Sequence, residues 1–185
     1  MEKNLLACGL AFLISFSLMP ASAYAVPGME YWNPITKVAL QVDAETIPDN
    51  VVSLGSAAAI SWYYTPASIS TNSRIEVAGA VNIILVDGST LTANVGTHVG
   101  PSSSLTIYEQ ERGTGHLIAT TDSSTRNAGI GGNGSTTGSG ESSGTITICG
   151  GMVSANISGN SDHSGAEIGG GSSVTRGSGQ TVTHV

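Results

Sequence analysis

The sequence predicts an all-β chain wound as a right-handed parallel β-helix, with three strands per coil and about three and a half coils. Short aliphatic strand patterns recur in a fixed order from residue 74 to the end of the chain. Two segments, AGIGG at 128–132 and AEIGG at 166–170, are nearly the same. Such repetition is typical of a solenoid, in which repeats bury one another's apolar faces, and crossover connections between parallel strands are right-handed.

Three sets of predicted strands make up each coil. The first set is 74–77, 97–99, 128–130 and 166–168; the second is 83–86, 105–108, 146–149 and 182–185; the third is 91–93, 117–119 and 153–155. Because strand side chains alternate with a period of two, aliphatic residues should stack in columns. The predicted columns are Ile83, Leu105, Ile146 and Val182; Leu85, Ile107 and Ile148; Leu91, Leu117 and Val153; and Val77, Val99, Ile130 and Ile168.

Composition limits the partners. Only 10% of the 185 residues are charged, against about a quarter in an average domain, and the net charge is −7 with six basic residues. Nucleic-acid binding requires clustered Lys and Arg, so this class of partner is excluded.

The first residues read as a targeting segment. Lys3 precedes an apolar run at 5–19, Pro20 and two overlapping A-x-A sites, which predicts a signal peptide over 1–25 and a secreted or cell-surface protein. The apolar run is shorter than the roughly 20 residues of a membrane span, so a retained anchor is the weaker alternative and the mature chain should not span a membrane.

Residues 26–60 are predicted to be an N-terminal leader or cap, because Pro27, Pro34 and Pro48 interrupt long elements. Residues 61–185 are predicted to be the β-helix repeats. The aromatic run at 62–64 has bulk that suits a cap over the first coil; an aromatic binding platform is the alternative.

Several segments also carry a resemblance to a known family. They are IEVAG at 75–79, VNIILVDGSTLTA at 81–93, LTIY at 105–108, GTG at 113–115, AGIGG at 128–132 and GTITI at 144–148. They resemble the Gly-rich repeats of secreted and surface proteins of gut and anaerobic bacteria, often described as carbohydrate-binding-domain-containing. The resemblance implies a right-handed parallel β-helix and a non-catalytic extracellular module joined to further modules and an anchor.

Because the predicted last strand runs to Val185 without a cap, we expect a C-terminally truncated β-helix, the front part of a longer protein with further modules beyond it.

Catalysis is not expected. The enzyme class natural to a β-helix, polysaccharide lyase or hydrolase, needs two positioned carboxylates or a calcium cluster with a basic residue. Past residue 25 the sequence has no Asp-Asp pair, no Gly-His-Gly and Lys37 as its only lysine. Cys149, between Ile148 and Gly150 in a strand pattern, reads as a small packed side chain rather than a nucleophile.

A ligand-binding surface is predicted on the outward side of the second strand set. Ile84, Thr106, Thr147 and Thr183 should form one row there, with Tyr108 beside it. The Thr106, Thr147 and Thr183 hydroxyls would hydrogen-bond a sugar chain while Tyr108 stacks on a ring face. The alternative is the ordinary preference of Thr and Tyr for exposed strands.

A metal site is the weakest of the predictions. Asp87 and Glu109 should follow equivalent strands in successive coils, and stacked carboxylates repel unless a cation such as Ca²⁺ separates them. Solvated turns are the alternative. We expect no other cofactor, since His98, His116 and His163 lack metal-ligand spacing.

The sequence therefore predicts a β-helix module that binds polysaccharide or a cell-surface glycan, or mediates adhesion. A structural stalk or passenger segment of a larger surface protein is the first alternative, and a polysaccharide lyase or hydrolase fragment is the second.

Overall fold

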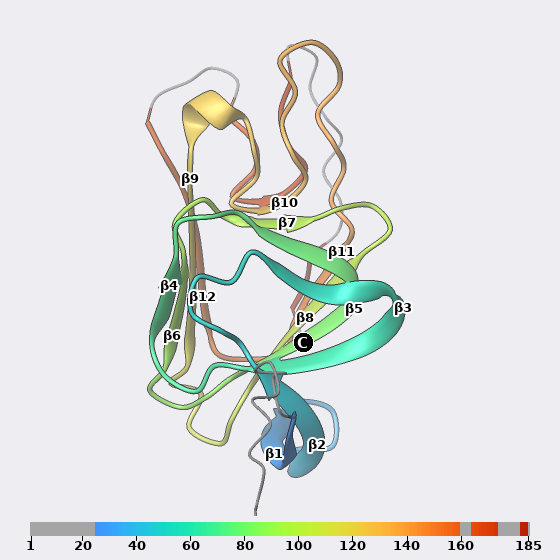
Figure 1. The fold of residues 1–185 in the computed structure, drawn as a ribbon, viewed down its shortest axis with the longest axis vertical. Helices are drawn as coiled ribbons and strands as arrows, with labels where there is room; N and C mark the ends of the chain where they lie inside the picture. The colour runs from blue at the N-terminus through green and yellow to red at the C-terminus, as the bar shows by residue number, and fades with distance from the viewer. Residues whose placement is uncertain (1–24, 160–163, 174–181, 185) are drawn as a thin grey trace, which may run out of the picture.

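The computed structural model describes residues 25–159, 164–173 and 182–184, the last three as backbone only (Figure 1). The chain is all-β: the only helix among these residues is the 3-10 turn Ser123–Thr125. The strands are β1 Ala25–Asn33, β2 Val38–Thr46, β3 Ser53–Tyr64, β4 Ile69–Thr71, β5 Ile75–Leu85, β6 Thr90–Ala93, β7 Thr97–Val99, β8 Ser104–Glu109, β9 His116–Asp122, β10 Ile130–Gly131, β11 Thr145–Ile148, β12 Met152–Ser158, β13 Ile168–Gly169 and β14 Val182–His184.

The chain begins with an antiparallel hairpin of β1 and β2, which lies at one end of the molecule (Figure 1). Asn33 shapes its turn, because its side-chain oxygen accepts hydrogen bonds from the backbone of Ile35 and Thr36, both at 2.9 Å. The hairpin joins the rest of the fold where Glu45 and Thr46 of β2 pair with Tyr63 and Tyr64 of β3. This pairing of β2 with β3 is parallel, and so are all other strand pairs in the described residues except the hairpin itself.

A four-stranded parallel sheet, in the order β12-β9-β6-β4, forms one side of the molecule (Figure 1). Its register is unbroken and aligns Leu91 with Leu117 and Val153, as the third strand set predicts. Ile69 of β4 precedes them in the same column. This first member was not predicted, because its segment ends in Thr71 where the other three end in alanine.

The remaining strands form a ten-stranded sheet, whose long strand β5 takes part in two ladders. Its first half pairs with β7 and its second half pairs with β8, while β10 and β13 continue the first ladder and β11 and β14 the second. Figure 1 shows β7 and β10 crossing between the four-stranded sheet and the side that carries β3, β5 and β8.

The core lies between these sides and consists of stacked aliphatic residues. Ile107 and Ile148 are in register, and both belong to the same buried cluster as Leu91 and Leu117. Each fully buried aliphatic side chain contributes roughly 1.5–3 kcal/mol, so neighbouring repeats stabilise one another through these columns.

The predicted register of the second strand set is wrong by two residues at its first member. Leu105 lies opposite Val81, and Ile107 lies opposite Ile83. The cause is that β5 continues unbroken from Ile75 to Leu85, so its pairing begins earlier than the aliphatic run at 83–86 indicates. A shift of two leaves every side chain on its predicted face.

The first strand set needs a similar correction. Val77 pairs with Val99 as predicted, but Ile130 pairs with Thr97 rather than with Val99. β10 contains only Ile130 and Gly131, and Gly131 adopts φ +136. A Cβ on Gly131 would lie 1.9 Å from the carbonyl oxygen of Gly169, so glycine is required where the strand ends.

The predicted boundary between a cap at 26–60 and repeats at 61–185 falls inside β3. The hairpin differs from the rest of the fold, whereas β3 already belongs to the parallel sheet through its pairing with β5. The predicted signal segment 1–25 lies outside the described residues apart from Ala25, the first residue of β1. In the described part of the chain no helix is long and apolar enough to cross a membrane.

Candidate functional site

The outer face of the ladder formed by β3, β5, β8 and β11 carries a row of polar side chains. Thr106 lies opposite Thr147, and the backbone of Thr183 lies next to Thr147. Asn82, not Ile84 as predicted, continues the row on the other side of Thr106. Asn82, Thr106 and Thr147 are half-buried and alternate with fully buried core residues, so their side chains face outward. We call these three residues the hydroxyl row, after its threonines.

An aromatic cluster stands at the end of this row. Trp62 pairs with Asn82, so it extends the hydroxyl row by one strand. Its ring stacks on that of Tyr108, with centroids 5.2 Å apart, and Tyr31 of the hairpin contacts both rings at 5.0 and 4.8 Å. Such contacts are each worth roughly 0.5–1.5 kcal/mol beyond the area they bury.

The side chain of Tyr108 is therefore less accessible to a ligand than the sequence predicts. Its ring is half-buried and engaged by two aromatic neighbours. Burial raises the pKa of its phenol above the usual value, with smaller contributions from Cys149 and Tyr31, so the hydroxyl stays neutral and keeps its proton. Ile84, opposite Tyr108 on β5, is fully buried, which shows that this end of the outer face is covered.

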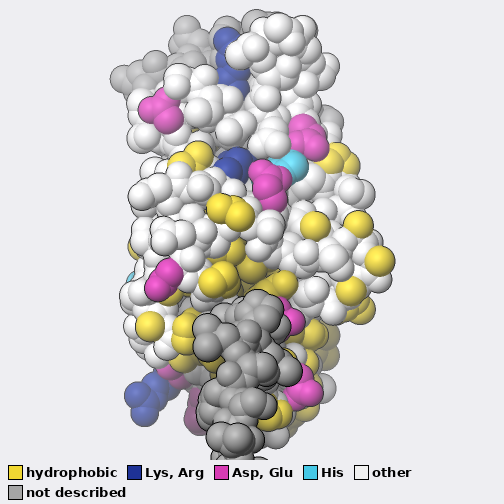
Figure 2. All heavy atoms as spheres, in the orientation of Figure 1, with side chains coloured by type: hydrophobic (Ala, Val, Ile, Leu, Met, Phe, Trp, Pro, Cys, Tyr) yellow, Lys and Arg dark blue, Asp and Glu magenta, His cyan; other side chains and the backbone are white. Residues whose placement is uncertain are grey.

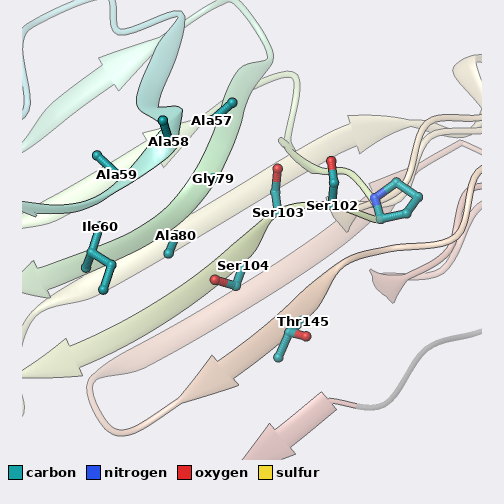
Figure 3. A pocket seen from close by; sticks show the side chains of 11 residues that line it. Ala57, Ala58, Ala59, Ile60, Gly79, Ala80, Ser102, Ser103, Ser104 and Thr145 are labelled. Atoms are coloured by element: carbon teal, nitrogen blue, oxygen red, sulfur yellow. The ribbon is translucent and has the colours of Figure 1, made fainter.

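A bulge in β3, before Trp62 in the strand, forms an open hollow on the outer face. Gly55 pairs with Ala78 and Ile60 with Ala80, so the four residues 56–59 of β3 stand against Gly79 alone. The displaced backbone walls an open hollow of about 460 Å³ (Figure 3). Its floor is a register row of small side chains beside the hydroxyl row. This row consists of Ala80, Ser104 and Thr145, and the larger, exposed Ile60 of β3 lies next to Ala80.

Two glycines make this bulge sterically possible. Gly55 has φ +81 and Gly79 has φ +71, values that side-chain-bearing residues rarely adopt. A Cβ on Gly79 would lie 2.2 Å from the carbonyl oxygen of Ser56, and one on Gly55 would lie 2.3 Å from that of Ala78. The hollow therefore depends on close backbone approach at both positions.

A second hollow of about 330 Å³ continues from the first and contains a Glu-His-Glu cluster. β5 and β7 place Glu76 opposite His98, and Nδ1 of His98 contacts the Glu76 carboxylate. Nε2 of His98 lies 2.7 Å from Oε2 of Glu141, a residue of the long connection before β11. Figure 2 shows a histidine between acidic side chains, with a basic side chain beside them.

Arg74 binds backbone next to this cluster. Its guanidinium donates to the carbonyl oxygens of Val95 at 3.1 Å, Ala128 at 2.9 Å, Gly131 at 3.1 Å and Gly132 at 3.4 Å. Burial lowers its pKa to about 10, against the opposing attraction of Glu76 and Glu141. Arg74 thus ties successive repeats together through Nη1 and Nη2, which donate to main chain, while its buried Nε has no hydrogen-bond partner.

The predicted pairing of Asp87 with Glu109 is wrong. Glu109 lies opposite Leu85, two residues before Asp87, because of the shifted register of β5. Oε2 of Glu109 accepts a hydrogen bond from the backbone of Gly151 at 2.8 Å. The argument for Ca²⁺ from stacked carboxylates therefore fails, and no group of three or more His, Cys, Asp or Glu in the described residues is arranged to hold a metal ion.

Asp87 instead shapes the turn after β8. It accepts hydrogen bonds from the backbone of Arg112 and of Thr114, each at 3.1 Å, and from the Thr114 hydroxyl at 3.2 Å. Burial alone would raise the pKa of Asp87, but these hydrogen bonds and the charge of Arg112 outweigh it, so the pKa is lowered.

Sequence analysis missed the Glu-His-Glu cluster although part of its signal was present. Glu76 and His98 occupy equivalent places in the first strand set, so their contact follows from the alignment of 74–77 with 97–99. Glu141 lies in an insertion of Gly, Ser, Thr and Asn whose path the repeat does not specify. Cys149 is buried as predicted, and burial raises the pKa of its thiol.

Comparison with protein-family models, curated proteins and solved structures finds no match to the chain. The geometry of the outer face therefore carries the functional argument. It combines hydroxyl and amide groups, an open hollow and an aromatic cluster on adjacent parallel strands.

Proposed function

We propose that this chain is a secreted or cell-surface, non-catalytic module that binds a polysaccharide along the outer face of β3, β5, β8 and β11. The observation that carries the proposal is the shared register of Trp62, Asn82, Thr106 and Thr147. An aromatic ring and three hydrogen-bonding side chains stand in one line across four neighbouring strands, and Thr183 continues the line by its backbone position.

The spacing of this line suits a chain of sugar rings. Neighbouring strands lie about 4.8 Å apart, so equivalent side chains recur at that interval across the sheet. This interval is close to the length of one ring in an extended polysaccharide, and a glycan running across the strands would meet one polar side chain per ring. Trp62, half-buried against Tyr31 and Tyr108, would add an apolar contact for a sugar ring at the end of the line.

The hollow at the β3 bulge leaves room for the bound polysaccharide. Ala80, Ser104 and Thr145 are small, so a bulky ligand can approach the sheet closely beside the hydroxyl row. The hydroxyls of Ser104 and Thr145 add donors and acceptors next to Thr106 and Thr147.

We propose the right-handed parallel β-helix as the architecture behind this face. The parallel register in all three strand sets and the double role of β5 support it, and the right-handed preference of parallel crossovers supports its hand. A structural stalk or passenger is the second candidate, favoured by Arg74, which donates hydrogen bonds to backbone carbonyl groups up to 58 residues from it in sequence. A lyase or hydrolase is the third, and release of oligosaccharide from a bound polysaccharide would distinguish it.

A binding assay with a matched pair of variants tests the proposal. The purified chain is run through gels containing single soluble polysaccharides, and retardation gives the affinity. We expect at least one polysaccharide to retard the protein, and the double substitution Thr106→Ala with Thr147→Ala to weaken binding about tenfold, since each lost hydrogen bond is worth roughly 0.5–1.5 kcal/mol.

Thr92→Ala is the control, because Thr92 is an equally half-buried threonine on the outer face of the four-stranded sheet. Its removal should leave retardation unchanged. Absence of retardation by every polysaccharide, or equal loss of binding in Thr92→Ala, would contradict the proposed face and favour the stalk.

A further inference from the structure

The two hollows of the outer face form one continuous groove. Both are lined by Ala57, Gly79 and 101–103. A glycan that follows the small-residue row beside the hydroxyl row therefore passes beside the second hollow, where Glu76, His98 and Glu141 lie. The chemistry of this cluster bears directly on which glycan can occupy the groove.

The cluster presents negative charge to the groove. Side chains of Glu76 and Glu141 are 52% and 35% exposed, whereas that of His98 is 16% exposed. Both ring nitrogens of His98 are engaged by the two carboxylates. Two carboxylates bound to one imidazole keep a net negative charge whether or not the imidazole is protonated, and their exposed oxygens face solvent.

No basic side chain in the described residues lines the groove. None of Lys37, Arg74, Arg112 and Arg126 lines either hollow. Arg74 attracts Glu76 and Glu141 and so offsets part of their charge, but it does not face the groove, and its Nη1 and Nη2 groups donate to four backbone carbonyl groups. Arg126 donates to the carbonyl oxygen of Ser135 in a loop.

The aromatic end of the face is acidic as well. A smaller hollow of about 280 Å³ beside Tyr31 is lined by Glu30, Asp87 and Glu111. Between the two acidic ends, the hydroxyl row and its neighbouring small-residue row contain no charged side chain. The carboxylates lie beyond these two rows in the direction of the strands, so a glycan that runs across the strands would lie between them, over uncharged groups.

We infer that the face selects uncharged polysaccharides and rejects polyanionic ones such as uronate-rich or sulfated chains, with Glu76 and Glu141 as specificity-determining residues at the groove end. This inference rests on the proposed function. Like charges brought within a few ångströms in a partly desolvated groove repel, and salt screens that repulsion. The uncharged middle would bind the neutral chain through hydrogen bonds and ring stacking.

The test compares polysaccharides that share a backbone and differ in charge. Hydroxyethyl and carboxymethyl derivatives of the same glucan backbone form one pair, and the native and carboxymethylated forms of a xylan and a galactomannan form two more. Dissociation constants are measured with the full chain at 20 mM and 500 mM salt. We expect the neutral member to bind about tenfold or more tightly at low salt, and the difference to shrink at high salt.

Two variants assign this discrimination to the cluster. The substitutions Glu76→Gln and Glu141→Gln remove the negative charges and keep side-chain amides, one of which can accept from His98 while the other donates to it. Together they should bring the affinity for the carboxymethylated chain at low salt to within about threefold of the neutral one. Glu45→Gln with Glu167→Gln is the control, since both residues are exposed, line neither hollow and change the net charge equally.

The outcomes separate this inference from the proposal on which it rests. Tighter or salt-independent binding of a carboxymethylated chain, with the neutral chain also bound, overturns the charge selection and leaves the glycan-binding face intact. Equal relief by the control pair overturns the assignment to Glu76 and Glu141. Failure of all neutral and charged chains to bind overturns the proposed function and the inference with it.

Discussion

The two sides of the molecule are built from the same kind of parallel ladder but end as different surfaces. The four-stranded sheet runs β12-β9-β6-β4 without a register shift. The opposite ladder contains the bulge in β3, the hydroxyl row and the aromatic cluster. Both sides bury stacked aliphatic residues, so they differ in how the outer face is shaped rather than in what holds the core together.

The difference shows that a row of hydroxyl groups does not by itself make a groove. The outer face of the four-stranded sheet also carries a row with Ser70, Thr92 and Ser154, interrupted by Ile118. Its strands lie in continuous register, whereas the opposite face gains a wall from the four residues of β3 that have one partner residue on β5. The groove therefore comes from the irregularity and not from the repeat.

The largest effect is expected in the shared core. Ile107→Ala and Leu117→Ala, one on each side, should each lower the free energy of unfolding by about 2–5 kcal/mol, because both side chains are at most 1% exposed. Thr106→Ala, adjacent to Ile107 but outward-facing, should change it by no more than about 0.5 kcal/mol. Urea unfolding followed by circular dichroism measures the free energy of unfolding of all three variants. A large decrease for only one of Ile107→Ala and Leu117→Ala would contradict the idea that both sides share one core.

An intermediate effect is expected at the bulge. Gly79→Ala should lower the free energy of unfolding by about 1–3 kcal/mol and also weaken polysaccharide binding, because the added Cβ meets the Ser56 carbonyl oxygen. Gly88→Ala is the matched control: its φ is +77, close to the +71 of Gly79, but nothing lies within 4 Å of the added Cβ.

The control therefore isolates the cost of the backbone conformation. It should destabilise less than Gly79→Ala and leave binding unchanged. If the two variants behave alike in both stability and binding, close packing at the bulge does not shape the groove.

The smallest effect is expected at a turn between the two sides. The pKa of Asp87 is lowered in the folded chain, so its contribution to stability is present above the unfolded-state pKa and is lost as pH falls through the folded-state pKa. Asp87→Asn should lower the melting temperature slightly at pH 6 and reduce its decrease between pH 6 and pH 3. A variant whose melting temperature falls as steeply as that of the unmodified chain over this interval would argue against the Asp87 turn.

Residue pattern alone predicted a substantial part of this structure. The alternation of Leu105, Ile107, Ile146 and Ile148 predicted buried columns and outward threonines, and the structure shows both. These features depend on neighbours along the chain, so a local pattern is enough to specify them.

The candidate site was only partly predictable, because it depends on contacts between segments that are distant in sequence. Thr106 and Thr147 were expected side by side, but Asn82 replaced Ile84 in their row because the length of β5 was hidden in a continuous run of apolar residues. Tyr31 was not expected to meet Trp62 and Tyr108, since the hairpin that carries it follows no repeat. The predicted stacking of Asp87 on Glu109 was wrong because of the same two-residue shift in register.

The sequence by itself determined the all-β class, the three strand sets and the face on which each core side chain lies. The reason is that successive side chains of a strand point to opposite faces, so the alternation is visible in neighbouring residues. Only the tertiary structure decided the register between repeats, the hollow at the β3 bulge and the meeting of Glu76, His98 and Glu141. A shift of two residues leaves the pattern of buried and exposed positions unchanged. Only contacts between segments distant in sequence select one register over another, and those contacts shape the groove.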